Sequence, residues 1–263
     1  MKLRIEACAI SDIGKVRQSN QDNFVFSENS FELSNDRKRF DSFIVEVSPS
    51  VFTTGVFDGM GGESHGDLAS YIATKEYQEF ELIKLRNLVE TVEIIEEVKE
   101  YYHKANQAIC NECQSKKSRM GTTAAILIFT EKEAIISNIG DSRIYRLREK
   151  KLTLLTRDHT ENMTLIANNI KTFSKKGRLT QYLGIFEDEY IIEPYINVQY
   201  LRDADVFLVC SDGVTDMLSD DEIELLINAG TSIQETTEQI VESALQKGGV
   251  DNITAILCSI RHL

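Results

Sequence analysis

The stretch GVFDGMGGESHGDLAS, residues 55–70, decides the fold prediction, because a strand-like apolar run ends there in one aspartate and a cluster of glycines. Glycine loses the most backbone freedom on folding, so four glycines after Asp58 indicate a chain bent tightly around something small. One interpretation is a glycine-rich turn between a strand and a helix. The other is a carboxylate and a bare carbonyl presented together to a cation. The stretch alone leaves both open.

Composition limits the class of protein. The 263 residues are 42% hydrophobic and 27% charged, with two prolines, which is typical of a globular chain with its own core. The formal net charge of −13 disfavours nucleic acid as a partner, because an acidic surface repels phosphate backbones and the basic runs are short. An excess of acid also arises where carboxylates gather to hold metal ions.

The five cysteines predict reduced, buried thiols, because their number is odd and their surroundings are mostly apolar. CNEC at 110–113 resembles half a zinc site, but no second cysteine pair or histidine pair follows at a suitable spacing. The start, MKLRIEACAI, carries Glu6 where a signal peptide would be apolar, and no apolar run approaches membrane-spanning length. We therefore expect a soluble, cytoplasmic protein without membrane contact.

Short apolar or alternating runs predict an α+β fold. Amphipathic helices are expected at 66–84, 88–114, 219–230 and 232–249, and strands at 3–10, 23–27, 43–47, 51–57, 123–130, 134–139, 143–148, 152–155, 190–199, 205–211 and 252–260. This order lacks the regular strand–helix alternation of a doubly wound sheet, so antiparallel sheets with helices packed outside fit better. One domain over 1–263 is expected, with the polar residues 28–50 as a hairpin extension or insertion.

Three aspartates share one local pattern. Asp58 and Asp212 each follow a buried strand and precede a glycine, and Asp251 precedes the strand-like run NITAILCSI. Any one of them alone would be interpreted as a turn residue. A sheet can bring all three to one edge, however, and carboxylates with water in the remaining positions suit Mg²⁺ or Mn²⁺. The three together favour a metal site.

The segment GKVRQSNQDNFVF (14–26) adds Arg17 just before a strand, followed by Gln21 and Asp22. Arginine grips phosphate with two parallel hydrogen bonds, and a binuclear metal centre lowers the pKa of bridging water to make a nucleophile. This combination suits the hydrolysis of a phosphate ester. The phosphate loop GxxxxGK[ST] of nucleotide kinases is absent from the sequence.

Eight motifs, in order, resemble the metal-dependent serine/threonine protein phosphatases of the 2C type, and bacterial members in particular. They are VRQSNQD (16–22), VFDGMGG (56–62), GTTAAILIF (121–129), NIGDSRIYRL (138–147), LTRDHT (155–160), LTQYLG (179–184), VCSDGVTD (209–216) and GGVDNITAIL (248–257). The resemblance implies a four-layer α/β/β/α sandwich, in which two antiparallel sheets are flanked by helix pairs and a binuclear metal site lies at one end.

The resemblance also implies a role for each matched residue. Asp58 would bridge two Mn²⁺ or Mg²⁺ ions, the carbonyl of Gly59 would bind one ion, and Asp212 and Asp251 would complete the other. Arg17 would hold the substrate phosphate.

Further residues near this centre are less directly matched. Asp22 would orient metal-bound water, and Gln21 stands where some relatives carry glutamate. Asp141 matches a residue linked to a third, weaker ion in bacterial members, with a plain turn aspartate as the alternative. Met60 occupies the place of a histidine proposed as general acid in animal members, so that role is unassigned.

By the same resemblance, residues 159–179 would form a flap over the active site, shorter here than in many bacterial members. Within it, Lys175, Lys176 and Arg178 could meet an acidic phosphopeptide, or could form a solvated turn.

The activity implied by the resemblance is hydrolysis of phosphoserine and phosphothreonine in proteins by metal-bound hydroxide, in signalling opposite a serine/threonine kinase. The alternative is a catalytically inactive relative that acts as a regulatory or binding module. We disfavour it because the three aspartates and Arg17 are all present. A metal-dependent nuclease is disfavoured by the acidity and the missing basic groove.

Overall fold

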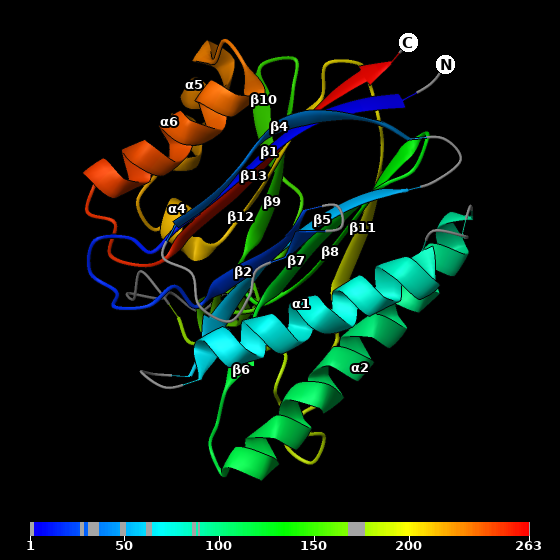
Figure 1. Ribbon diagram of the computed structural model, residues 1–263, viewed down its shortest axis with the longest axis vertical. Coiled ribbons are helices and arrows are strands. Elements are labelled where there is room, and N and C mark those ends of the chain that lie inside the picture. The colour runs from blue at the N-terminus through cyan, green and yellow to red at the C-terminus, as the bar shows by residue number, and fades with distance from the viewer. Residues whose placement is uncertain are drawn as a thin grey trace.

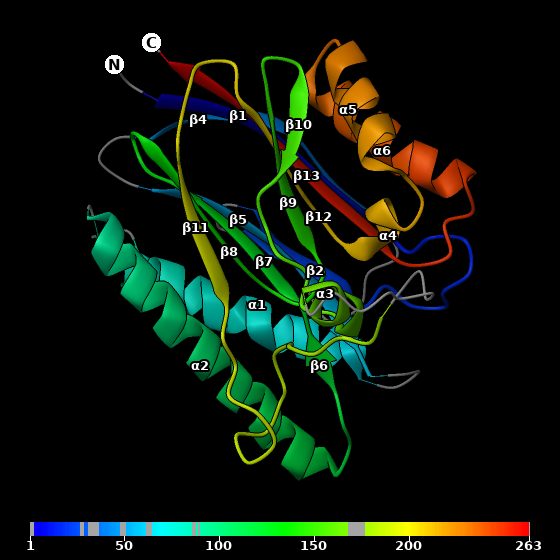
Figure 2. The same ribbon diagram turned by 180° about the vertical axis from the view of Figure 1, so that it is seen from behind.

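Two antiparallel sheets packed face to face form the centre of the structure (Figures 1 and 2). The computed structural model describes residues 3–26, 29–30, 37–47, 51–61, 65–85, 88, 90–167 and 177–262. The first sheet contains, in spatial order, β10 (Lys151–Leu154), β9 (Arg143–Arg148), β12 (Val206–Cys210), β13 (Ile253–His262), β1 (Leu3–Asp12) and β4 (Arg37–Val47). The second contains β11 (Tyr195–Tyr200), β8 (Glu133–Ile139), β7 (Ala124–Phe129), β5 (Phe52–Met60), β2 (Asp22–Phe26) and β3 (Asn29–Ser30), with β6 (Gly121–Thr122) paired to β5.

A helix pair covers the outer face of each sheet, which completes the four layers and confirms the predicted α+β sandwich. Helices α1 (Gly66–Ile83) and α2 (Thr91–Lys116) lie outside the second sheet, and α5 (Asp220–Ala229) and α6 (Ile233–Gln246) lie outside the first (Figure 1). The helix α5 begins at the predicted serine cap, because the Ser219 side chain accepts a hydrogen bond from the backbone N–H of Glu222.

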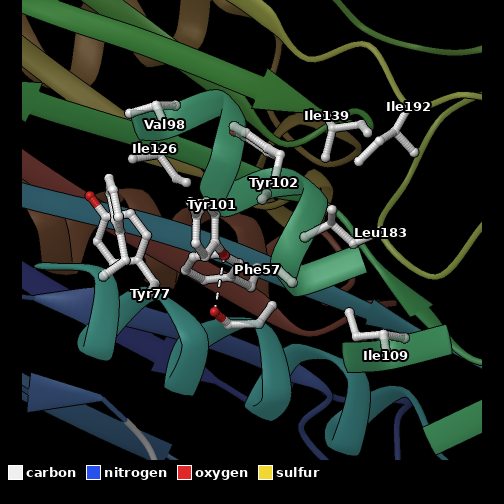
Figure 3. Close-up of a cluster of buried hydrophobic side chains, with 14 of the residues drawn as sticks. Phe57, Tyr77, Val98, Tyr101, Tyr102, Ile109, Ile126, Ile139, Leu183 and Ile192 are labelled. Carbon is white, nitrogen blue, oxygen red and sulfur yellow. Dashed lines mark hydrogen bonds between the residues drawn. The ribbon is translucent and has the colours of Figure 1, made fainter. Parts of the chain in front are cut away.

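Three hydrophobic cores separate the four layers, and the strands alternate between them. Along β7, Ala124, Ile126 and Ile128 face α1 and α2, whereas Ala125, Leu127 and Phe129 face the other sheet. Both faces of this strand are therefore buried, which explains why its sequence is an unbroken apolar run. Figure 3 shows the outer core of the second sheet, where Phe57 packs with Tyr77, Tyr101 and Tyr102 from α1 and α2.

Strand pairing defines two ends of the sandwich. Strands β1 and β13 run antiparallel, with Leu3 opposite His262 at one end and Asp12 opposite Ile253 at the other. At this second end β2 pairs with β5 in the other sheet, where Asp22 lies opposite Asp58. The predicted metal ligands therefore come from strand ends of both sheets.

Some predicted elements were wrong in extent or missed. The strand expected over 43–47 begins already at Arg37, as strand β4 paired with β1. The strand expected over 190–199 begins only at Tyr195, after Pro194. The short helices α3 (Glu161–Ala167) and α4 (Asp212–Thr215) were not predicted. Parts of the predicted extension and flap, 31–36, 48–50 and 168–176, lie outside the described residues.

The cysteine prediction is confirmed, because all five thiols are free and buried. The helices of the described residues include none with both the length and the apolar character to cross a membrane.

Candidate active site

A pocket of about 490 Å³ opens at the end of the sandwich where Asp22 lies opposite Asp58. It is lined by Arg17, Gln21, Asp58, Gly59, Met60, Gly61, Thr123, Asp141, Gly177, Arg178, Leu179, Asp212 and Asp251. Every predicted site residue except Asp22 is in this lining. Segments far apart in the sequence therefore meet around one space that contains four carboxylates.

Asp58 and Gly59 are fixed by the strands and the helix around them. The backbone N–H of Asp58 donates to Thr123 Oγ1 at 3.0 Å, and its carbonyl accepts from Thr122 Oγ1 at 2.9 Å. A Cβ atom on Gly59 would lie 2.1 Å from the carbonyl oxygen of Gly66, at the start of α1. Only glycine fits at this position, so the tight bend seen in the sequence is a close approach between β5 and α1.

Asp212 and Asp251 are brought together by the packing of α4 against the start of β13. Asp212 is the first residue of α4, and a Cβ atom on the next residue, Gly213, would lie 1.9 Å from the carbonyl oxygen of Asn252. The side chain of Asn252 donates to the carbonyl of Ile13 at 2.8 Å and accepts from the backbone N–H of Gln21 at 2.8 Å. Asn252 thus ties the segment that carries Arg17 and Gln21 to the strand that follows Asp251.

Arg17 binds Asp251 directly. Its Nε donates to Asp251 Oδ1 at 2.8 Å and its Nη2 to Asp251 Oδ2 at 2.6 Å, and the arginine side chain is 52% exposed. The hydrogen bond to Asp251 raises the pKa of Arg17 further, so the guanidinium stays charged. The geometry is the two-pronged one with which arginine also binds phosphate.

Asp22 lies behind the pocket wall, where two hydroxyls donate to it. Ser211 Oγ and Thr254 Oγ1 each donate to Asp22 Oδ2 at 2.7 Å, and all three side chains are buried. Burial raises the pKa of Asp22 to about 7, although the two hydrogen bonds act in the opposite direction. Asp22 therefore holds the segment just before Asp212 against β13.

The pocket carboxylates repel one another. The pKa of Asp58 is raised well above its ordinary value, first by burial and then by the charges of Asp212, Asp22, Asp141 and Asp251. Among the described residues, however, no three His, Cys, Asp or Glu side chains already stand as a metal-binding group. The four carboxylates nevertheless line one pocket, and Arg17 binds Asp251 there.

The donors around the pocket fit a hard divalent cation. They are mainly carboxylate and carbonyl oxygens, which is the set that Mg²⁺ and Mn²⁺ prefer, and the lining residues include neither cysteine nor histidine. A volume of about 490 Å³ would accommodate cations with bound water together with a phosphoryl group.

The raised pKa of Asp22 gives a testable prediction for the protein in chelator. Asp22 titrates near 7 when folded and near 3.8 when unfolded, so between these values the folded state binds the extra proton and stability falls as pH rises. The midpoint of thermal unfolding is expected to be higher at about pH 5.5 than at about pH 8. Each kcal/mol by which the free energy of unfolding falls between these pH values should lower the midpoint by about 2–4 °C. Asp22→Asn should reduce this difference. An equal difference in both proteins would contradict the assignment.

Sequence reasoning missed several supporting residues. Thr123 belongs to the matched motif GTTAAILIF and was given no role at the site, but it lines the pocket, holds Asp58 and contacts Ser142 Oγ at 2.7 Å beside Asp141. Ser211 and Thr254 were not singled out at all. The only signal for them is their place beside Asp212 and in the run after Asp251, which is weak for such common residues.

Comparison with known proteins identifies the class. The family model described as Protein phosphatase 2C matches residues 32–258. The chain belongs to this family and is a serine/threonine protein phosphatase.

Two curated relatives come from bacteria. The chain is 34% identical over 213 residues to protein phosphatase PhpP of Streptococcus pneumoniae, covering 78% of this chain and 84% of PhpP. It is 29% identical over 256 residues to serine/threonine phosphatase stp of Listeria monocytogenes, covering 94% of this chain and 92% of stp.

Solved structures share the fold over nearly the whole chain. The serine/threonine phosphatase of S. agalactiae superposes with a TM-score of 0.82 at 27% identity, covering 97% of this chain and 98% of that one. The catalytic domain of the serine/threonine protein phosphatase PstP, solved in complex with two manganese ions, gives a TM-score of 0.78, covering 99% and 100% of the chains. At 24% identity the PstP match shows the fold alone.

Proposed function

We propose that this phosphatase hydrolyses phosphoserine and phosphothreonine in proteins by direct attack of water on phosphorus, at a binuclear Mn or Mg centre held by Asp58, Gly59, Asp212 and Asp251. Two divalent cations bound there would lower the pKa of a shared water and neutralise charge on the phosphoryl oxygens. One observation carries the proposal: four carboxylates and Arg17 line the same pocket.

Each residue of the centre would have a separate role. Asp58 would bridge the two ions, the carbonyl of Gly59 would bind one, and Asp212 and Asp251 would bind the other. When Asp251 turns toward its ion, Arg17 would release it and bind two phosphoryl oxygens instead. A guanidinium can form the same pair of hydrogen bonds with a carboxylate and with a phosphate. Gly59 and Gly61 keep the pocket floor free of side chains where phosphate enters.

Other residues would position this machinery. Asp22 would hold the hydroxyls of Ser211 and Thr254 through the two hydrogen bonds of 2.7 Å, and would thereby keep Asp212 in position. Gln21 would contact ion-bound water at the pocket wall. Asp141 would bind a third, weaker ion, which its place in the same lining supports.

We also propose that the protein works in the cytoplasm on phosphorylated proteins, opposite a serine/threonine kinase. The free, buried state of all five cysteines supports a reducing compartment.

A matrix of metals and substrates tests the proposal. The wild-type protein, treated with chelator and then assayed with p-nitrophenyl phosphate and a phosphoserine peptide, should be inactive until Mn²⁺ or Mg²⁺ is added, because its carboxylates cannot activate water alone. Isothermal titration calorimetry should detect Mn²⁺ binding in the absence of substrate. A protein that binds no Mn²⁺ and hydrolyses neither substrate would favour the inactive regulatory module.

A further inference from the structure

The pocket wall carries a second arginine besides Arg17. Arg178 lines the pocket together with its neighbours Gly177 and Leu179, and its side chain is exposed. Within the described part of the chain, its guanidinium makes no hydrogen bond or ion pair. Arg17, in contrast, is held by Asp251. Arg178 is thus a cation of the pocket whose charge is still available to a substrate.

The backbone of Arg178 is nevertheless firmly placed. Its carbonyl accepts a hydrogen bond from the backbone N–H of Glu161 at 2.9 Å, and the next residue, Leu179, forms a bridge with Thr160. One step further, the backbone N–H of Thr180 donates to the carbonyl of His159 at 2.8 Å. Arg178 therefore sits on a short two-stranded ladder formed with residues 159–161.

This ladder is anchored to the turn that carries Asp141. The backbone N–H of His159 donates to the carbonyl of Gly140 at 2.9 Å, and the backbone N–H of Gly140 donates back to His159 Nδ1 at 3.1 Å. Beside them, Arg143 Nη2 donates to Asp158 Oδ2 at 2.7 Å. The backbone that carries the exposed guanidinium of Arg178 is thus already ordered, which lowers the entropic cost of binding a substrate group.

The charges of the pocket indicate what Arg178 would bind. If two divalent cations occupy the centre, their charge of +4 cancels the −4 of the four lining carboxylates. The phosphoryl dianion then meets the ions and Arg17. Arg178 remains as a positive charge on the rim, where the polypeptide on either side of the phosphorylated residue must pass.

We propose that Arg178 is a specificity-determining residue, which binds a carboxylate side chain adjacent to the phosphorylated serine or threonine, so that the enzyme prefers phosphopeptides with an acidic neighbour. This inference rests on the proposed function. The phosphate dianion itself is the alternative partner for Arg178, and the experiment separates the two.

The experiment compares matched phosphoserine peptides that carry Glu or the isosteric, uncharged Gln at one position, before or after the phosphoserine. The quantity measured is the ratio of kcat/KM for the Glu peptide to that for the Gln peptide, in which any general loss of activity cancels. For at least one position, wild type is expected to prefer Glu by about two- to fivefold, as for an exposed ion pair. Arg178→Ala should bring the ratio to about one, and Arg178→Glu should invert it.

Two controls make the ratio specific to this residue. Lys132→Glu makes the same charge change on an exposed residue at the β7–β8 turn, and it should keep the wild-type ratio. Raising the salt from about 50 mM to about 500 mM should shrink the wild-type preference, because exposed charges are screened, whereas a purely structural role would not respond.

The outcomes distinguish the two proposals. A wild-type protein that hydrolyses neither p-nitrophenyl phosphate nor the peptides in Mn²⁺ would overturn the proposed function. Hydrolysis of both peptides at equal rates would overturn only the role of Arg178. An Arg178→Glu variant that loses activity on both peptides to the same degree would assign Arg178 to the phosphoryl group, and would also overturn the inference.

Discussion

Replacing Asp58 with asparagine is expected to lower kcat/KM by at least about 1,000-fold, because one carboxylate would be lost from both ions and from the activated water between them. The assay is hydrolysis of p-nitrophenyl phosphate in saturating Mn²⁺, since a small substrate isolates the chemistry from peptide binding. Calorimetry of the same variant should show weakened Mn²⁺ binding. Activity within about tenfold of wild type would rule out a bridging role for Asp58.

The same substitution should leave the metal-free protein at least as stable as wild type. Asp58 has a raised pKa because it is buried among other carboxylates, so its charge destabilises the fold in the absence of ions. An amide removes that charge while keeping the size of the side chain. Thermal unfolding in chelator should therefore show an unchanged or higher midpoint for Asp58→Asn, together with a smaller rise on adding Mn²⁺. Asp188→Asn, in an exposed loop, should change neither activity nor stability.

Replacing Arg17 with alanine is expected to lower kcat/KM by about 100-fold, through the loss of two charge-assisted hydrogen bonds to phosphate. Arg17→Lys keeps the charge but not the two-pronged geometry, so a loss of about tenfold is expected. Inhibition by inorganic phosphate should weaken in the same order, since this product would bind the same guanidinium. Unchanged inhibition by phosphate in Arg17→Ala would contradict the role.

The Mn²⁺ affinity of the Arg17 variants is a second measurement that tests the role of this residue. In the structure Arg17 holds both oxygens of Asp251, which is also a proposed metal ligand. Removing Arg17 should free Asp251 and remove a positive charge from the pocket, so Mn²⁺ should bind at least as tightly to Arg17→Ala as to wild type. A protein damaged in its fold would instead lose metal binding and catalysis together, so calorimetry separates the two explanations.

Most of the fold could be predicted because both faces of many strands are buried, which leaves apolar runs that the sequence shows directly. The first part of strand β4, before residue 43, was missed for the opposite reason. Strand β4 lies at the edge of its sheet and has the sequence RKRFDSFIVEV, with Ile44 63% exposed, so polar and charged residues obscure its alternation. The early start predicted for β11 ignored Pro194, which cannot donate a hydrogen bond within a sheet. Helix α4 has only one turn, too short to show a helical period.

The candidate site was predictable where one residue type carries the chemistry. An aspartate beside a glycine at the end of an apolar run is visible in sequence, as at Asp58 and Asp212. Contacts between distant segments are not. The pairing of Arg17 with Asp251 joins residues 234 positions apart, and the hydroxyls of Ser211 and Thr254 meet Asp22 only in the folded sheets. Such partners are common residue types, and only tertiary packing selects them.

The antiparallel pairing of β1 with β13 matters for anything attached to the enzyme. Leu3 and His262 lie opposite one another, and Asp12 and Ile253 meet at the pocket end, so nine residue steps separate the two ends of each strand. At about 3.3 Å per step, a tether joined to either distal strand end would emerge about 30 Å from the pocket. A reporter dye, an affinity handle or a surface linker placed there would leave the opposite end of the molecule open to a large phosphoprotein.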